Sequence, residues 1–198
     1  MMSAVFQSPF LPIAIGFFGL GTNYFVWGGQ ALFAYPKMSH DVDKTMALWG
    51  IFMGGFMQFI TGVYLMVGLS WFPVYTAKAP LYMAALAFTA YGVHWFAVSW
   101  RRYVGASSDV EGWMAIPFAL ISILGMLVFF QATDEPVGIL FLILSLIYLF
   151  EIPTRLVGVG WVRGGRMVGF WQFLGAIWLM YLTYGVVCDT ALAQHWWI

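Results

Sequence analysis

Long apolar runs alternate along the chain with short charged segments. Six of these runs are long enough to cross a membrane as helices, because one crossing takes about 20 apolar residues. They cover residues 10–34, 45–70, 80–100, 113–132, 137–157 and 168–190. None shows the strict apolar–polar alternation of a membrane β-barrel strand. The pattern predicts an all-α membrane protein with six transmembrane helices, and residues 1–198 show no shift in composition that would divide them into more than one domain.

The charged connecting segments predict the orientation. Seven of the eight Lys and Arg lie beside the first, third and fifth connections, and only Lys78 lies in the second. Basic residues in short loops stay on the cytoplasmic side of a membrane. We therefore expect these three loops to be cytoplasmic and both termini to face outward.

Composition places the chain in the membrane class and narrows its chemistry. The chain is 63% hydrophobic and 8% charged, a balance that soluble globular domains do not have. Its formal net charge is zero, which gives no indication of a nucleic-acid partner. Cys188 is the single cysteine, so neither an internal disulfide nor a cysteine metal cluster is expected. His94 has no second histidine at ligand spacing, so we expect no metal or other cofactor.

Nearly every predicted helix carries one or two neutral hydrogen-bonding side chains. An unpaired amide in hydrocarbon costs several kcal/mol, so each needs a partner or a water-filled path. Buried carboxylates, which mark ion-driven pumps, are limited to Glu151 and Asp189 near span ends, and Arg155 follows Glu151 at the i, i+4 spacing of a local ion pair. Such a lining suits a small polar solute. The candidate path-lining residues are Asn23, Gln58, Thr89, His94 and Gln131, with Tyr91 beside them.

The second predicted span carries a stripe of small residues at four-residue spacing. Gly50, Gly54, Gln58 and Gly62 fall on one helix face. Small residues let membrane helices approach closely, so one interpretation is a packing interface joined by the Gln58 amide. The other is a narrow polar path with Gln58 as one of its hydrogen-bonding groups.

Two motifs resemble the acetate uptake transporter family, the bacterial succinate–acetate permeases. They are "GIFMGGFMQFITG" at Gly50–Gly62 and "FTAYGVHW" at Phe88–Trp95. The N-terminal "SPFLPIAIGFFG" keeps only part of that family's first-helix motif. The resemblance implies a six-helix protomer, a hexameric assembly in a bacterial inner membrane and one substrate path in each protomer.

The same resemblance implies a hydrophobic constriction in each path. Residue-by-residue matching gives Phe18, Tyr91 and Leu146 for it, and the Tyr91 hydroxyl is expected to face the solute. The six-helix plan and outward termini also resemble the urea and amide channel family, which places a glutamate where Glu151 stands.

Three functions follow as hypotheses. The first is a transporter or channel for a small monocarboxylate such as acetate. The second is a channel for urea, an amide or ammonia on the same architecture. The third is an accessory subunit of a larger membrane complex that has lost the path. An enzyme is not expected, because the sequence shows no nucleophile–base pair and no metal-ligand set.

Overall fold

The computed structural model describes residues 13–71, 79–157 and 161–198, and the side chains of all of these except 161–163. The described residues form helices and short connections, without a strand. The helices are α1 (Ile13–Phe33), α2 (His40–Trp49), the π-helix η1 (Gly50–Met57), α3 (Gln58–Trp71), α5 (Pro80–Val104), α6 (Glu111–Gln131), α7 (Glu135–Leu156) and α8 (Trp161–Leu192). The all-α prediction is confirmed for this part of the chain.

Each predicted span coincides with one long helical segment. The second corresponds to α2, η1 and α3, which together run without a break over His40–Trp71. Within the described residues, five segments are long and apolar enough to cross a membrane: His40–Trp71, Pro80–Val104, Glu111–Gln131, Glu135–Leu156 and Gly164–Leu192. Helix α1 is not among them, because Asn23, Gln30 and several glycines lower its hydropathy. A membrane crossing by the first predicted span, residues 10–34, therefore stays a prediction. Residues 10–12 of this span lie outside the described part of the chain.

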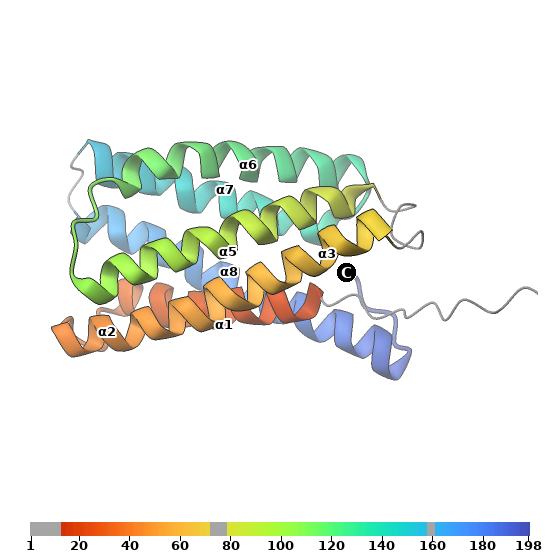
Figure 1. Cartoon of the computed structure of the whole chain (residues 1–198), viewed down its shortest axis with the longest axis horizontal. Helices are drawn as coiled ribbons and strands as arrows, with labels where there is room; N and C mark the ends of the chain where they lie inside the picture. The colour runs from red at the N-terminus through yellow and green to blue at the C-terminus, as the bar shows by residue number, and fades with distance from the viewer. Residues whose placement is uncertain (1–12, 72–78, 158–160) are drawn as a thin grey trace, which may run out of the picture.

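The long helices run up and down side by side (Figure 1). The α1–α2 and α5–α6 connections lie at one end of the bundle, together with the end of α7 and the start of α8 (Figure 1). We call this end of the bundle the basic end, because the sequence places seven of the eight Lys and Arg beside these connections. It contains Ala34–Ser39, Gly105–Val110, Leu156 and Gly164. The α6–α7 connection and the C-terminus lie toward the opposite end.

Local sequence signals explain where several helices begin and end. Ser39 caps α2, and its Oγ accepts a hydrogen bond from the Val42 N–H at 3.2 Å. Asp134 caps α7 in the same way through the Val137 N–H, also at 3.2 Å. Gly105 ends α5 with a φ of 71°, a left-handed conformation that glycine adopts without the steric cost of a side chain. These caps satisfy backbone groups that have no partner within the helix.

Glycines bring the backbones of α1 and α8 into contact. A Cβ atom on Gly28 would lie 2.8 Å from the backbone N of Phe173 and 3.0 Å from the carbonyl O of Gly169. A Cβ on Gly169 would in turn lie 2.9 Å from the Leu32 N. Membrane helices gain dispersion contacts through such close approach. The pair therefore sets the spacing of the first and last helices of the bundle.

The glycine stripe of the second span packs against α5 and α1. A Cβ on Gly62 would lie 2.5 Å from the backbone N of Thr89, and one on Gly54 would lie 2.7 Å from the Asn23 Nδ2. Gln58 is 1% exposed between these two levels. The glycines of the stripe therefore form a packing interface, whereas the role of Gln58 as a hydrogen-bonding group of a path stays a prediction.

Replacing Gly28 with alanine is expected to destabilise the protein by about 1–3 kcal/mol, because the methyl group meets backbone atoms that cannot rotate away. Gly29→Ala is the matched control, since its Cβ would have no neighbour nearer than 3.8 Å and alanine is the better helix former. Thermal unfolding of both variants in detergent measures the difference. Equal midpoints for Gly28→Ala and the wild type would contradict the close contact.

Candidate functional site

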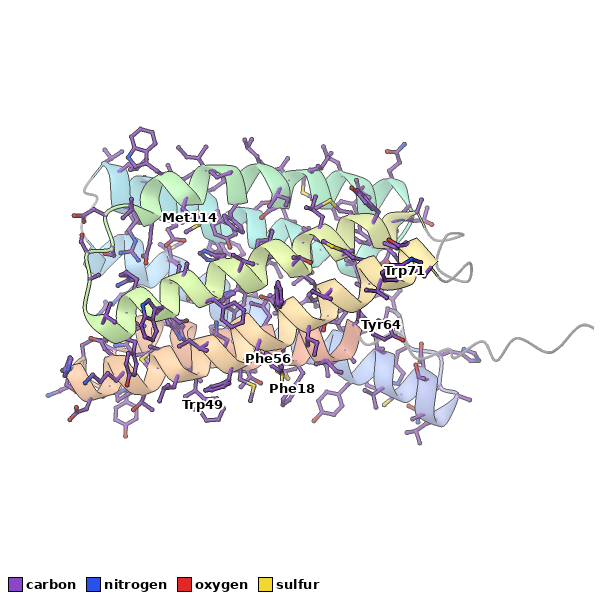
Figure 2. The ribbon with its side chains drawn as sticks, in the orientation of Figure 1. Phe18, Trp49, Phe56, Tyr64, Trp71 and Met114 are labelled. Atoms are coloured by element: carbon purple, nitrogen blue, oxygen red, sulfur yellow. The ribbon has the colours of Figure 1, made fainter. Side chains whose placement is uncertain are left out.

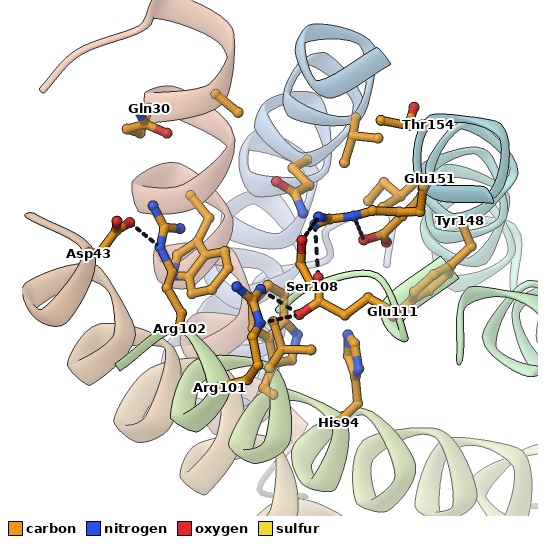
Figure 3. Close-up of a pocket in the computed structure, with 18 of the residues that line it drawn as sticks. Gln30, Asp43, His94, Arg101, Arg102, Ser108, Glu111, Tyr148, Glu151 and Thr154 are labelled. Carbon is orange, nitrogen blue, oxygen red and sulfur yellow. Dashed lines mark hydrogen bonds and ion pairs between the residues drawn. The ribbon is translucent and has the colours of Figure 1, made fainter. Parts of the chain in front are cut away.

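A cavity of about 540 Å³ opens at the basic end of the bundle. Helices α1, α2, α5, α6, α7 and α8 contribute to its wall, which makes it the place where most of the chain converges. Its lining is unusually polar for an apolar protein, as the close-up shows (Figure 3). The polar and charged lining residues are Gln30, Asp43, His94, Arg101, Arg102, Ser108, Asp109, Glu111, Glu151, Thr154, Arg155 and Gln172.

Glu111 is the centre of an ion-pair network in this wall. It lies in the first turn of α6 and is 7% exposed. Its Oε1 accepts a hydrogen bond from Arg101 Nε of α5 at 2.7 Å, and its Oε2 lies 2.8 Å from Arg155 Nη2 of α7. One carboxylate therefore joins the ends of three helices. Charged hydrogen bonds of this kind are stronger than neutral ones.

Arg155 extends the network along α7 and into the α5–α6 connection. Its Nε lies 3.6 Å from Glu151 Oε1, and its Nη1 donates a hydrogen bond to Ser108 Oγ at 2.7 Å. The predicted local ion pair between Glu151 and Arg155 is confirmed. The contact with Ser108 also fixes the connection that forms the rim of the cavity (Figure 3).

Arg102 joins the other side of the cavity to α1 and α2. Its Nε donates to Asp43 Oδ1 at 2.7 Å, and its guanidinium lies 4.4 Å from the centre of the Trp27 ring. The Trp27 Nε1–H donates to the Met46 carbonyl at 3.0 Å. A guanidinium over an indole face gains a cation–π attraction. Each of the three cavity arginines thus has a carboxylate partner, which leaves the lining close to neutral.

Four rings close the inner end of the cavity. His94 and Tyr148 line the cavity itself, with Phe118 and Tyr91 packed behind them. The His94 and Phe118 ring centres are 4.7 Å apart, those of Phe118 and Tyr148 are 5.5 Å apart, and Tyr91 stacks on Tyr148 at 6.1 Å and 6°. We call these four residues, which come from α5, α6 and α7, the aromatic cluster. It separates the cavity from the middle of the bundle.

The Tyr91 hydroxyl has a defined partner inside the protein. It lies 2.7 Å from Ser122 Oγ, and Ser122 donates its own proton to the Phe118 carbonyl at 2.6 Å. A serine hydroxyl has a single proton to donate, so the Tyr91 O–H is the donor to Ser122. The expectation that this hydroxyl faces the solute is therefore wrong for the conformation described. The ring, and not the hydroxyl, faces the other members of the aromatic cluster.

Comparison with known proteins identifies the fold. No known protein family matches the chain, and no curated protein is significantly similar to it in sequence. A solved structure, described as that of the bacterial acetate channel SatP, superposes with a TM-score of 0.69 at 15% sequence identity. The match covers 93% of this chain and 96% of that one. The chain has the fold of a bacterial acetate channel. The resemblance to the acetate uptake transporter family is thus supported at the level of the fold.

Only some of the sequence-predicted site residues lie near the cavity in this SatP-like fold. His94 lines the cavity, and Tyr91 lies directly behind it in the aromatic cluster. Leu146 is partly buried on α7, two residues before Tyr148. Gln131 is exposed at the C-terminal end of α6. Thr89 is partly buried, and its hydroxyl donates to the Ala85 carbonyl of its own helix at 2.8 Å.

Phe18 lies on the outside of the bundle. It is 43% exposed, and Figure 2 shows it near Phe56 on the surface formed by α1 and η1. Its neighbour Phe17 is 3% exposed and packs its ring 5.6 Å from that of Phe88. The aromatic residue that α1 directs into the protein is therefore Phe17. Adjacent positions on a helix differ by about 100° in direction, so a one-residue error in motif matching moves a side chain from inside to outside.

Asn23 and Gln58 form a second buried polar region. Asn23 is 0% exposed, and within the described residues neither atom of its amide has a hydrogen-bond partner. The Gln58 Oε1 and the Trp95 Nε1 are likewise buried without one there. These groups lie between α1, the second span and α5, beside the cavity wall formed by Trp95. They stay candidate path-lining residues.

The residues that sequence analysis missed are mostly charged or aromatic. Arg101 served there only as evidence of membrane orientation, Arg155 only as that and as the local partner of Glu151, and Glu111 stands at the border of a loop. Phe118 and Tyr148 could not be singled out by residue type, because the apolar spans contain many other aromatic residues. A usable signal existed for Tyr148, because Glu151 and Arg155 follow on the same helix face.

Glu111→Gln is expected to destabilise the protein by roughly 3 kcal/mol, because it leaves two largely buried arginines without their shared carboxylate. Asp109→Asn is the control, since Asp109 is an exposed residue of the adjacent loop that pairs with Ser107. Thermal unfolding in detergent gives both values. A Glu111→Gln variant as stable as Asp109→Asn would show that the network does not hold the three helices together.

Proposed function

We propose that this protein is a membrane channel or transporter for a small monocarboxylate such as acetate. The observation that carries the proposal is the polar cavity that ends on the aromatic cluster, within a chain that has the fold of an acetate channel. A cavity of about 540 Å³ accepts a solute of a few heavy atoms with its water. Its mixed donors and acceptors replace part of that hydration shell.

The aromatic cluster is the proposed constriction of the path. Tyr91 is the member that the family resemblance also indicates, and Phe17, rather than Phe18, is the aromatic side chain that α1 places in the interior. Apolar rings at a narrow point block water until they separate, which closes a path without any charge. Asn23, Gln58, Thr89 and Leu146 are proposed to line the path beyond this point.

The charge balance of the cavity favours a solute that crosses in its neutral form. Arg102 is paired with Asp43, and Arg101 and Arg155 share Glu111. A path selective for anions is expected to present uncompensated cations. The ion pairs of these arginines therefore argue against selectivity for anions. The proposed permeant species is therefore the protonated acid. The same observation supports a second candidate function, a channel for urea or a small amide.

Flux into proteoliposomes separates these two functions. Labelled acetate and labelled urea are offered at several external pH values, with protein-free liposomes as the control for diffusion through lipid. If the neutral acid crosses, protein-dependent acetate flux rises about tenfold for each unit by which pH falls, well above the pKa of the acid. Urea flux with no protein-dependent acetate flux would transfer the proposal to the amide channel. If neither crosses, the accessory-subunit hypothesis replaces both.

Tyr91→Ala is expected to raise the flux of the permeant solute severalfold, because it removes a ring from the aromatic cluster. Tyr91→Phe keeps the ring and loses only the bond to Ser122, so its flux is expected to stay within twofold, about 0.4 kcal/mol in barrier height. Tyr82→Ala, at a position that is 71% exposed, controls for loss of a tyrosine elsewhere on α5. Unchanged flux in correctly inserted Tyr91→Ala would remove Tyr91 from the constriction.

The functional unit that we propose is a homo-oligomer in a bacterial inner membrane, with both termini outward. The family resemblance implies six copies, each with its own path. The apolar outer surface of the chain, which includes Phe18 and Phe56, is compatible with contacts to lipid or to further copies. Native mass spectrometry of the detergent-solubilised protein gives the number of copies.

A further inference from the structure

A groove of about 600 Å³ runs along the side of the bundle between α5 and α6. We call it the α5–α6 groove. It exists because α5 packs mainly on the second span while α6 packs mainly on α7, so that the two consecutive helices diverge along their length (Figure 1). Its walls are almost entirely apolar, and they include Leu86, Ala90, Val93 and Ala97 of α5 with Met114 and Phe118 of α6.

The α5 wall of the groove is long and follows one face of the helix, with the small residues Ala90 and Ala97 among its lining. Its lining positions recur every three or four residues from Leu86 to Arg101, which is one face of the helix. This stretch corresponds to roughly 22 Å at the helical rise per residue. The hydrocarbon of one membrane leaflet is about 15 Å thick. The groove is thus long enough for the acyl chain of one lipid along its whole leaflet.

The groove is polar at one end only. Arg101, Ser107 and Glu111 line that end, which is the basic end of the bundle. Three large aromatic residues lie at the same level of the bundle, near the end of α5 and the start of α6: Trp100 and Tyr103, whose rings stack with centres 5.8 Å apart, and Trp113, which is 68% exposed. Exposed Trp and Tyr mark the level of lipid headgroups. The groove therefore begins at headgroup level and descends into the hydrocarbon.

Charge at this end favours an anionic headgroup. Seven of the eight Lys and Arg belong to the connections of the basic end, together with five of the eight Asp and Glu. The excess of positive charge attracts the phosphate of an anionic lipid. Arg101 lines the groove and keeps a side-chain exposure of 24% beside its ion pair.

We propose that an anionic phospholipid binds here, with one acyl chain in the α5–α6 groove and its phosphate at Arg101. His94 and Phe118 line the groove and also belong to the aromatic cluster. The acyl chain therefore forms the side wall that α5 and α6 leave open beside the aromatic cluster, and it seals the proposed path from the side. This sealing role rests on the proposed function, whereas the binding of the lipid does not.

Lipid retention tests the binding directly. The wild-type protein is washed in detergent, given phosphatidylglycerol, washed again and weighed by native mass spectrometry. One retained lipid per chain is expected, and at least fivefold less when phosphatidylethanolamine replaces it. Val93→Trp fills the groove and is expected to lose the retained lipid. Leu124→Trp on α6 is the matched control, because Leu124 is 49% exposed, Val93 is 52% exposed, and Leu124 does not line the groove.

A second measurement uses the unmodified protein and so does not depend on how a variant folds. Phosphatidylglycerol with a photoactivatable acyl chain is added at less than one molecule per chain, and labelled peptides are mapped. Label concentrated at Val93, Ala97 and Met114 supports the site. Label spread over all exposed helix faces, or equal retention by Val93→Trp and Leu124→Trp, overturns it. Protection of these residues by a second copy of the chain, detected as a cross-linked dimer through the groove, also overturns it.

The flux assay then separates the two proposals. Lipid retention without any solute flux leaves the binding site standing and contradicts the proposed function. The sealing role is tested in the wild-type protein, because the tryptophan of Val93→Trp would itself fill the groove. Solute flux that stays selective in phosphatidylethanolamine liposomes without anionic lipid contradicts only the sealing role. Increased leak of urea and acetate together in those liposomes is the result expected if the acyl chain closes the path from the side.

Discussion

The ion pairs of Glu111 are the constraint on which the cavity depends. Arg101 and Arg155 reach the same carboxylate from α5 and α7, while Glu111 itself begins α6. The ends of three helices are held together at this point. Removing charges from water is costly, and the paired geometry with additional hydrogen bonds offsets that cost. The cavity is thus polar because its helices are joined by charges, and nearly neutral because those charges are paired.

The nearly neutral lining of the cavity and the aromatic cluster would both favour uncharged solutes over ions in the proposed path. In the proposed path, each arginine among the described wall residues is paired, which favours neutral solutes, and a constriction of rings excludes ions by the cost of removing their hydration. Tyr91, His94, Phe118 and Tyr148 meet below the cavity although they come from three helices. The similarity to SatP concerns the fold at 15% identity. For the proposed function, the choice of solute therefore depends on the side chains of this chain and not on the shared fold.

The divergence of α5 and α6 links the path to the surrounding lipid. His94 and Phe118 each have one side toward the aromatic cluster and another toward the α5–α6 groove. In the proposed arrangement, the bilayer is a structural component of the constriction, and not only the solvent of the outer surface.

The sequence by itself determined the helices. Long apolar runs between charged connections have one stable form in a membrane, because every backbone group must find its hydrogen bond within the segment. The Glu151–Arg155 pair was also predictable, because side chains at positions i and i+4 are neighbours on any helix. The close packing of Gly54 and Gly62 was one of two interpretations that their spacing allowed.

Only the tertiary structure decided which side chains share a site. Glu111, Arg101 and Arg155 are separated by up to 54 positions in sequence, and no local pattern relates them. Phe17 and Phe18 are adjacent in the motif, yet one is buried and the other exposed, because the rotation of α1 is set by its contacts with α8. Helix periodicity fixes which residues of one helix share a face, whereas the packing of several helices fixes which faces meet.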